Sequence, residues 1–197
     1  MNSWIKFFDE IFVLNLPERE DRMYDIDIML KEYEIPYTRI AATKHERGFI
    51  GLIETMKALF KACLEKGYTK VLLLEDDAKF TVSKDELDRV MNICTEDLKT
   101  IEWGLFYLGL QICQPFLGKR TQNLLHVQWG QSTHAVAYSK NAMEFILSSG
   151  ISEPVDNYIV NNYQKRGTSF CATQLLATQV KGFSNIENNM VDWDMYI

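Results

Sequence analysis

Apolar and polar positions follow two alternating periods along the first half of this chain. Short apolar runs predict strands over residues 11–16, 37–42 and 70–74. Between them, apolar positions spaced by three and four predict helices over residues 18–33 and 49–64. Strands joined by helices in this order form right-handed crossovers and a parallel sheet. The pattern therefore predicts an α/β fold.

The second half continues the alternation with weaker signals. Ser83, followed three residues later by Glu86, is a capping-box pattern that predicts a helix to about Lys99. Further strands are expected at residues 103–110, 124–129, 134–138 and 169–172, the middle two as antiparallel additions, and further helices at residues 140–147 and 154–166. No repeat or low-complexity segment interrupts the chain. Residues 1–197 are therefore expected to form a single domain, complete or part of a longer protein.

Composition narrows the class of protein. A chain of 197 residues with 47% hydrophobic residues can bury a sizeable core. Its formal net charge of −6 argues against a nucleic-acid partner, which would require a basic face. The cysteines are scattered without metal-ligand spacing and are expected to be reduced, mostly buried thiols: Cys63, Cys94, Cys113 and Cys171.

The N-terminal segment and the absence of long apolar stretches bear on location. No stretch approaches the length of a membrane span. Asp9 and Glu10 interrupt the first apolar residues before a signal-peptide core can form, so a cytoplasmic location is expected. Trp4, Phe7 and Phe8 predict a helical turn docked on the core, with weak membrane contact as the alternative.

The acidic triplet Glu75-Asp76-Asp77 directly follows the third apolar run and is the most informative motif. Carboxylates at the end of a buried strand are costly to bury and raise one another's pKa. A divalent cation on oxygen ligands would offset this cost, whereas the alternative is a solvated acidic turn. Because ligands of parallel sheets bind beyond the carboxyl ends of the strands, Asn15, Thr43 and the triplet are expected to converge on one rim.

Several segments together resemble glycosyltransferase family 25, the group that contains lipopolysaccharide and procollagen sugar transferases. That family begins with an apolar strand, an Asn-Leu pair and a nearby arginine, as at Asn15, Leu16 and Arg19 here. Its second apolar strand ends in Glu-Asp-Asp, like the triplet. Residues 133–142 and 154–156 are also similar to segments of the family. The resemblance extends over roughly residues 10–174.

One segment departs from the family. Just before its second helix the family carries Gly-Cys followed by a Ser-His pair, whereas this chain has Gly51-Leu52-Ile53-Glu54. The departure leaves the acceptor undefined, and a more distant relative of the family with the same fold is also consistent with it.

The resemblance implies a GT-A type, Rossmann-like fold with a mainly parallel central sheet, flanking helices and a small antiparallel extension. It also implies an inverting, metal-dependent transfer from a nucleotide-sugar donor, with UDP as the expected nucleotide, to a glycan or glycoprotein acceptor. Mn²⁺ or Mg²⁺ held by Asp77 and Glu75 would neutralise the diphosphate leaving group. Asp76 would accept hydrogen bonds from ribose or sugar hydroxyls. Alternatively, Glu75 only contacts a neighbouring backbone or basic group.

Other strand-end and helix-start residues are candidates for donor binding. The predicted donor contacts are Asn15, Leu16, Arg19, Arg22, Ala42, Thr43, Lys44 and Asp76. The arginines open a helix, where backbone N–H groups also favour anions. Alternatively, both arginines lie on a solvated helix face and pair with Glu18 and Asp21. Asn15 can instead satisfy a turn, and Lys44 can be an ordinary exposed lysine.

An inverting transfer requires a general base, and Asp156 is the first candidate because it matches the family's Pro-Val-Asp segment. The alternative for Asp156 is a helix-start carboxylate that stabilises the helix dipole. Asp192 and Asp194 in the C-terminal tail are further candidates. His134 lies in a predicted strand of alternating pattern, beside apolar neighbours, and is interpreted as a core histidine; the alternative is a contact with the acceptor.

Two other classes of function compete with a glycosyltransferase. A phosphotransfer domain also clusters acids at strand ends, but it requires its principal acid after the first strand, where this chain has Asn15. A non-catalytic glycan- or nucleotide-binding module with the same fold is the second alternative.

Overall fold

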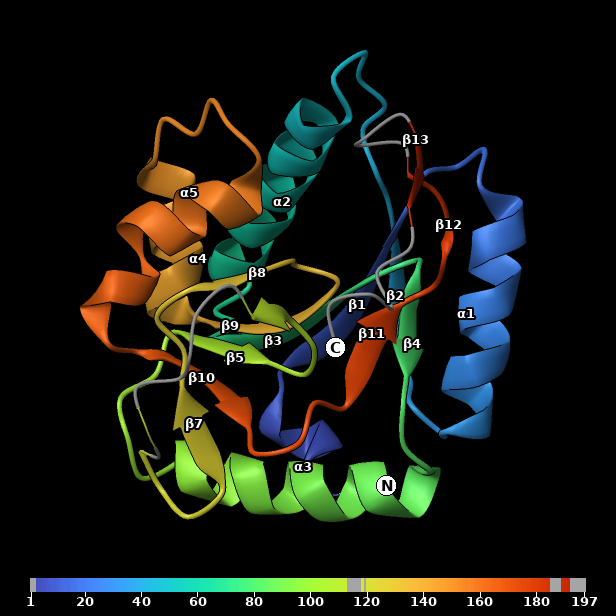
Figure 1. Ribbon diagram of the computed structural model, residues 1–197. Helices are drawn as coiled ribbons and strands as arrows, with labels where there is room; N and C mark the ends of the chain where they lie inside the picture. The colour runs from blue at the N-terminus through green and yellow to red at the C-terminus, as the bar shows by residue number, and fades with distance from the viewer. Residues whose placement is uncertain (1–2, 113–117, 119, 185–188, 192–197) are drawn as a thin grey trace.

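The computed structural model describes residues 3–112, 118, 120–184 and 189–191, and a seven-stranded sheet lies at its centre (Figure 1). The strands are β1 (Glu10–Asn15), β2 (Thr38–Ala41), β3 (Lys70–Glu75), β4 (Ala78–Phe80), β5 (Leu105–Tyr107), β6 (Gln111–Ile112), β7 (Leu124–His126), β8 (Gly130–Gln131), β9 (Ala135–Ser139), β10 (Ser169–Ala172), β11 (Ala177–Gln179), β12 (Gly182–Ser184) and β13 (Asn189–Val191). The α-helices are α1 (Glu20–Glu32), α2 (Gly48–Glu65), α3 (Lys84–Leu98), α4 (Lys140–Ser148) and α5 (Val155–Asn162), with 3-10 turns η1 (Ile5–Phe7) and η2 (Gln164–Arg166).

The central sheet has the order β2-β1-β3-β9-β5-β10-β7. β1 pairs in parallel with both β2 and β3, which confirms the βαβ series predicted for the first half. β9 is inserted antiparallel between β3 and β5, and β7 lies antiparallel beside β10. Five of the seven strands therefore share one direction, so the sheet is mainly parallel, as expected.

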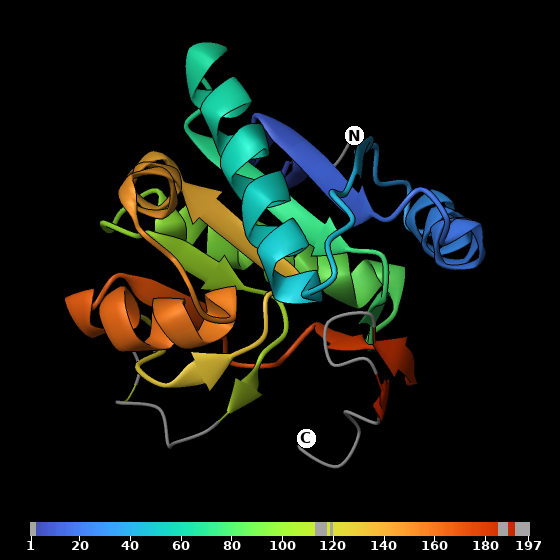
Figure 2. The ribbon, with the colours of Figure 1, turned by 90° about the horizontal axis from the view of Figure 1, so that it is seen from above.

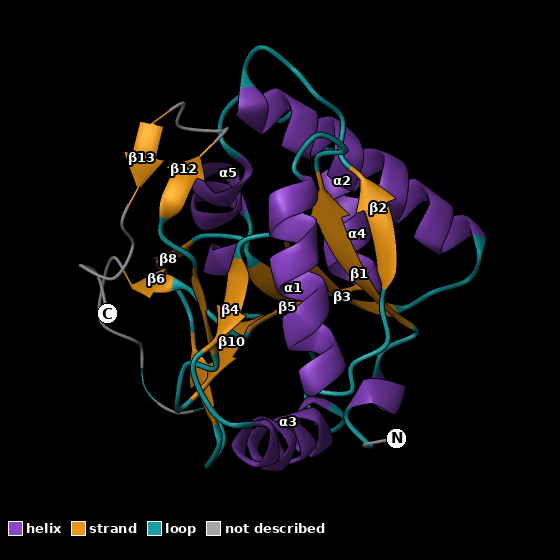
Figure 3. Cartoon of the chain, turned by 90° about the vertical axis from the view of Figure 1, so that its right-hand side faces the viewer, coloured by secondary structure: helices purple, strands orange, loops and turns teal. Residues whose placement is uncertain are grey.

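Helices cover both faces of this sheet (Figures 2 and 3). Val13 and Leu72 pack with residues of η1, α1 and α3 on one face. Phe12 and Leu73 pack with residues of α2, α4 and α5 on the other. Neighbouring strand residues thus alternate between two apolar cores, which explains why β1 and β3 read as continuous apolar runs.

The N-terminal turn and the described cysteines belong to the core. Trp4 is fully buried, and its Nε1 donates a hydrogen bond of 2.8 Å to Asp88 of α3. Phe7 and Phe8 are also buried, which confirms the docked turn. Cys63, Cys94 and Cys171 are free and buried as predicted, whereas Cys113 lies outside the described residues. Across the described ranges, we find no helix with both the length and the apolar character needed to span a bilayer.

The two strands predicted as antiparallel additions are β7 and β9; their direction is confirmed, and both lie within the central sheet. Three further short antiparallel pairs lie outside that sheet, at positions that were not predicted. β4 pairs with β11, β6 with β8, and β12 with β13. The predicted strand at 103–110 is shorter than expected, and the helix predicted to 166 gives way to η2 after Asn162. The β4–β11 pair bears most directly on the residues at the end of β3, because it places the strand that follows the triplet beside residues 177–179 (Figure 1).

Candidate functional site

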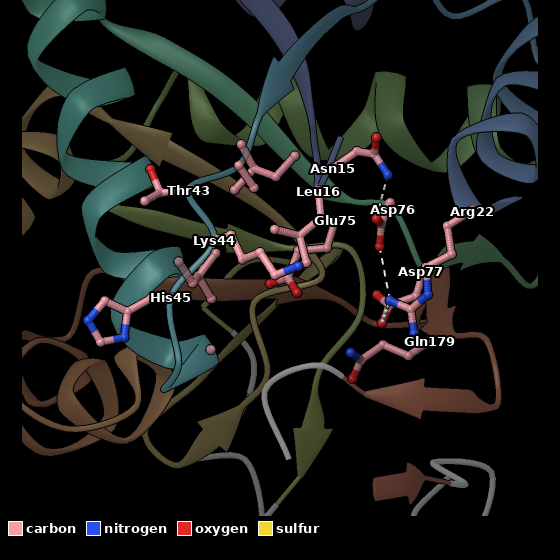
Figure 4. A pocket seen from close by; sticks show the side chains of 14 residues that line it. Asn15, Leu16, Arg22, Thr43, Lys44, His45, Glu75, Asp76, Asp77 and Gln179 are labelled. Carbon is pink, nitrogen blue, oxygen red and sulfur yellow. Dashed lines mark hydrogen bonds and ion pairs between the residues drawn. The ribbon is translucent and has the colours of Figure 1, made fainter. Parts of the chain in front are cut away.

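A cavity lies at the carboxyl ends of β1, β2 and β3, where the strand order predicts a ligand site (Figure 4). The predicted residues that line it are Asn15, Leu16, Arg22, Ala42, Thr43, Lys44, Glu75, Asp76 and Asp77. The three strand ends thus converge on one rim, and the predicted juxtaposition of Asn15, Thr43 and the triplet is confirmed. The roles of these residues remain predictions.

The three acids of the triplet have different neighbours. Asp76 accepts a hydrogen bond of 2.7 Å from the Asn15 side-chain amide, and Arg22 Nη1 lies 3.0 Å from the other oxygen of Asp76. The same Arg22 nitrogen lies 3.0 Å from Asp77 Oδ2. Glu75 accepts a 2.7 Å hydrogen bond from the Thr133 hydroxyl. The acids are therefore fixed by β1, α1 and the loop before β9.

Burial makes this cluster electrostatically unusual. It raises the pKa of Glu75 to about 8, with a smaller contribution from the charge of Asp77. Burial also raises the pKa of Asp76 and Asp77, although the guanidinium of Arg22 opposes both shifts. Asp77 Oδ1 is buried and accepts no hydrogen bond from the described residues. Burial therefore opposes the ionisation of all three acids, and one oxygen of Asp77 has no hydrogen-bond partner among the described residues.

The arrangement suits a hard divalent cation that takes only one or two ligands from the protein. Among the described residues, no group of three or more His, Cys, Asp or Glu side chains is placed to hold a metal ion. Mg²⁺ sites in nucleotide enzymes commonly use one or two carboxylates, together with substrate phosphates and water. Asp77, with its unpaired buried oxygen, and Glu75, with its raised pKa, are the oxygen donors that suit such a site.

Arg19 and Lys44, two of the predicted donor-binding cations, pair with acids outside the triplet. Arg19 does not line the cavity; its side chain forms a 2.8 Å ion pair with Asp21, which is the alternative that the sequence left open. Its backbone oxygen accepts a hydrogen bond from Asn15. Lys44 lines the cavity and forms an ion pair with Glu18. Arg22 is thus the arginine that the fold brings to the triplet.

Asp156 lies in the first turn of α5, close to the triplet but outside the cavity lining. Its two oxygens accept hydrogen bonds from the backbone N–H of Ser132, at 3.4 Å, and of Asn157, at 2.9 Å. Its negative charge makes a minor contribution to the raised pKa of Glu75. The other proposed acids, Asp192 and Asp194, lie outside the described residues.

His134 is buried, as the sequence predicted, and burial lowers its pKa to about 4. Its Nδ1 lies 2.6 Å from the Ser132 hydroxyl. These two residues and Asp156 do not form a nucleophilic triad, because Asp156 contacts the backbone of Ser132 and not the imidazole. The histidine instead supports the loop behind the triplet.

The cavity also contains residues that sequence reasoning missed: His45, Gly48, Leu52 and Gln179. His45 lies in the loop between β2 and α2, and Gly48 and Leu52 lie in the first turns of α2. Of the three, Leu52 belongs to the segment that departs from the family pattern. Gly51 is required there, because a Cβ would lie 2.1 Å from the carbonyl oxygen of Thr43. Thr55 completes the contact by accepting a 2.8 Å hydrogen bond from the Thr43 N–H. This segment therefore shapes the cavity wall.

Comparison with known proteins supports the resemblance found in the sequence. The chain is 24% identical over 216 residues to procollagen galactosyltransferase 2 of Homo sapiens, covering 90% of this chain and 34% of that protein. It is 25% identical over 142 residues to inactive glycosyltransferase 25 family member 3 of Homo sapiens, covering 55% of this chain and 23% of that protein. The chain thus spans about a third or less of the length of these relatives. No protein-family model matches it.

Solved structures share the fold at low sequence identity. The chain superposes on A197 from STIV with a TM-score of 0.55 and 13% identity, covering 92% of this chain and 91% of that one. It superposes on a glycosyltransferase involved in the glycosylation of the major capsid of PBCV-1 with a TM-score of 0.54 and 11% identity, covering 90% and 95%. These likenesses confirm the GT-A-like α/β fold, and the sequence relatives confirm the similarity to glycosyltransferase family 25.

Proposed function

We propose that this relative of glycosyltransferase family 25 moves a sugar from a nucleoside-diphosphate donor, with UDP as the nucleotide, to a glycan or glycoprotein acceptor. One observation carries the proposal. Asn15, Thr43 and the acidic triplet, which come from three strand ends, line a single cavity in a fold shared with a known glycosyltransferase. The sequence similarity to procollagen galactosyltransferases points to the same class of reaction.

The cavity offers suitable contacts for the donor. Ala42 and Gly48 are small residues on its wall and allow a nucleotide to approach the backbone. Lys44 and His45 at the rim are candidates to contact the diphosphate. The Asn15 amide donates to Asp76 and to the Arg19 backbone oxygen and accepts from Arg39, so it satisfies the turn after β1 and fixes this strand end beside the donor.

A divalent cation, Mn²⁺ or Mg²⁺, would be held by Asp77 and Glu75. When bound, it would act as a Lewis acid that neutralises the negative charge on the departing diphosphate. The buried, unpaired Oδ1 of Asp77 supports this assignment. Arg22 holds the carboxylates of Asp76 and Asp77 close together and partly balances their charge.

Asp156 is the proposed general base for inversion. The acceptor oxygen forms a bond to the anomeric carbon as the bond to the diphosphate oxygen breaks, and the acceptor's proton passes to the Asp156 carboxylate. A base of this kind contributes about 10²–10⁴-fold to the rate. The hydrogen bonds from the backbone N–H groups of Ser132 and Asn157 hold the Asp156 carboxylate at the start of α5.

A second candidate function is binding without turnover. It is favoured by the similarity to glycosyltransferase 25 family members that are named inactive. Such a module would use the same cavity to bind a nucleotide or glycan, and it would not transfer sugar. Donor binding alone does not separate the two functions, so turnover must be measured.

The donor and the cation are tested by thermal unfolding with UDP, GDP and their sugar conjugates, each with and without Mn²⁺. A ligand at about 100 times its Kd stabilises the folded chain by about 2.7 kcal/mol. We expect the largest Mn²⁺-dependent shift with a uridine diphosphate. Asp77→Asn should abolish that shift, whereas Asp25→Asn, at an exposed position on α1, should retain it. No Mn²⁺-dependent shift with any nucleoside diphosphate would overturn the proposal.

The base is tested by donor hydrolysis and by transfer to glycan acceptors. Asp156→Asn should bind the donor as the wild type does and lose turnover by about 10²–10⁴-fold. Retained turnover would exclude Asp156 as the base. If the wild-type chain binds donor and shows neither hydrolysis nor transfer, the binding-module function is supported.

A further inference from the structure

A chain of hydrogen-bonded side chains runs behind the triplet and ends at Gln179. The His134 imidazole lies 2.6 Å from the Ser132 hydroxyl, which donates a 3.1 Å hydrogen bond to the amide oxygen of Gln179. Gln179 in turn lines the cavity beside Asp77 (Figure 4). A residue from β11, far along the chain, is thereby fixed against the acids that end β3.

The backbone also fixes Gln179 relative to the triplet. In the β4–β11 pair, Gln179 lies opposite Ala78, the residue that follows Asp77. Val180 N–H donates a 2.7 Å hydrogen bond to the Asp77 carbonyl. Because Ser132 occupies the amide oxygen of Gln179, its NH₂ group is the end that remains for the acids.

Ser132 has an unusual backbone for a residue with a side chain. Its φ of 84° lies in the left-handed region, which glycine adopts freely and other residues rarely occupy. Such conformations cluster at functional sites. A glycine here would relieve the strain but would lose the hydroxyl that holds Gln179. The Ser132 N–H also contacts Asp156, so one residue links both ends of the site.

We propose that Gln179, held by Ser132, is a positioning residue that orients Asp77 for a divalent cation. Carboxylates that bind a metal are themselves held by hydrogen bonds, and losing such a partner typically weakens metal binding 10–100-fold. Gln179 is suited to this task because it is neutral and adds no further negative charge to the cluster. The inference rests on the cation site of the proposed function.

The test is a titration of the wild-type chain and its variants with Mn²⁺ alone, in which free Mn²⁺ is measured by electron paramagnetic resonance. Gln179→Leu keeps a similar size and removes the amide, so we expect Mn²⁺ to bind about 10–100-fold more weakly. Ser132→Gly should also weaken binding, because Gln179 loses the hydroxyl that holds it; relief of the left-handed backbone offsets part of the cost in stability. Gln174→Leu, at an exposed position after β10, is the matched control and should bind as the wild type does.

The outcomes separate this inference from the proposed function. If the wild type binds Mn²⁺ and Gln179→Leu binds it equally well, the positioning role is wrong and the cation site stands. If the wild type binds no Mn²⁺, with or without UDP, the cation site fails and the inference fails with it. Should Gln179→Leu fail to fold, Gln179→Asn replaces it, because the shorter amide cannot span the same distance from β11.

Discussion

We expect Glu75 to make the folding stability of this chain depend on pH in a direction opposite to that of most carboxylates. Burial, with the charge of Asp77, raises the pKa of Glu75 from its ordinary value of 4.5 to about 8. Between these values the folded chain keeps a proton that the unfolded chain has released. By linkage, the free energy of unfolding must fall as the pH rises through this interval.

The size of the effect follows from the same shift. Each tenfold change in proton affinity is worth about 1.4 kcal/mol, so a pKa raised from 4.5 to about 8 corresponds to at most about 5 kcal/mol. His134 acts in the opposite sense, because burial lowers its pKa from 6.5 to about 4. Its stabilising contribution grows with pH and is complete near its unfolded pKa of 6.5. Between about pH 6.5 and pH 8, the release of the Glu75 proton therefore lowers the free energy of unfolding by about 2 kcal/mol.

The assay is urea unfolding of the cation-free chain, kept in a chelator, at several pH values across that upper interval. The free energy of unfolding should be lower by about 2 kcal/mol at the upper end of the interval. In a thermal scan of a chain of this size, that loss corresponds to a melting temperature lower by about 4–8 °C. Glu75→Gln still accepts the Thr133 hydrogen bond and carries no charge, so its stability should vary less with pH. Glu54→Gln, at an exposed position on α2, should keep the wild-type slope.

Two results would refute this reasoning. The wild-type chain could be equally stable at both ends of the interval, or Glu75→Gln could retain the full slope. Mn²⁺ gives an independent check, because protons compete with a cation for the same carboxylate. The stabilisation by Mn²⁺ should therefore be larger at about pH 8 than at about pH 6.5, and the difference should disappear in Glu75→Gln.

Two further substitutions test the packing around the site. Arg22→Met removes the guanidinium that bridges two largely buried carboxylates. The free energy of unfolding, measured in urea at neutral pH, should therefore fall by about 3 kcal/mol, and Mn²⁺ should restore part of it. An unchanged stability would contradict the bridge. Gln164→Leu leaves the N–H and carbonyl of Gly130 and the Tyr107 hydroxyl without their buried partner. We expect a loss of about 2–4 kcal/mol in the same assay, and a loss below about 1 kcal/mol would show that the loop finds other partners.

The sequence predicted the half of the fold that builds the rim of the cavity. β1 and β3 read as strands because each residue packs into one of two apolar cores, as Val13 and Phe12 do. Short connections and the parallel order then placed Asn15, Thr43 and the triplet at one edge. These features depend on local periodicity and on the handedness of βαβ units, and both can be inferred from the chain itself.

The remaining part of the site depends on pairing between distant segments. β11 is three residues long and has no apolar alternation, so nothing in its sequence predicts a strand. It forms because β4 offers a partner, and this pairing places Gln179 at the triplet. Ser132 likewise has no sequence signal, because its left-handed backbone is imposed by the loop around it. Likewise, spacing alone could not tell that Arg22, and not Arg19, would reach the acids.

The roles proposed for the three acids of the triplet agree with what each acid already binds. Asp76 accepts hydrogen bonds at both oxygens, from Asn15 and from Arg22, and is therefore the acid most fully fixed by the protein. Asp77 shares the same guanidinium but keeps one buried oxygen unpaired among the described residues. Glu75 accepts one hydroxyl and has a raised pKa. A cation would thus bind most favourably to Asp77 and Glu75. It would be coordinated by the unpaired oxygen of Asp77 and would displace the proton of Glu75, and the hydrogen bonds that hold Asp76 would stay intact.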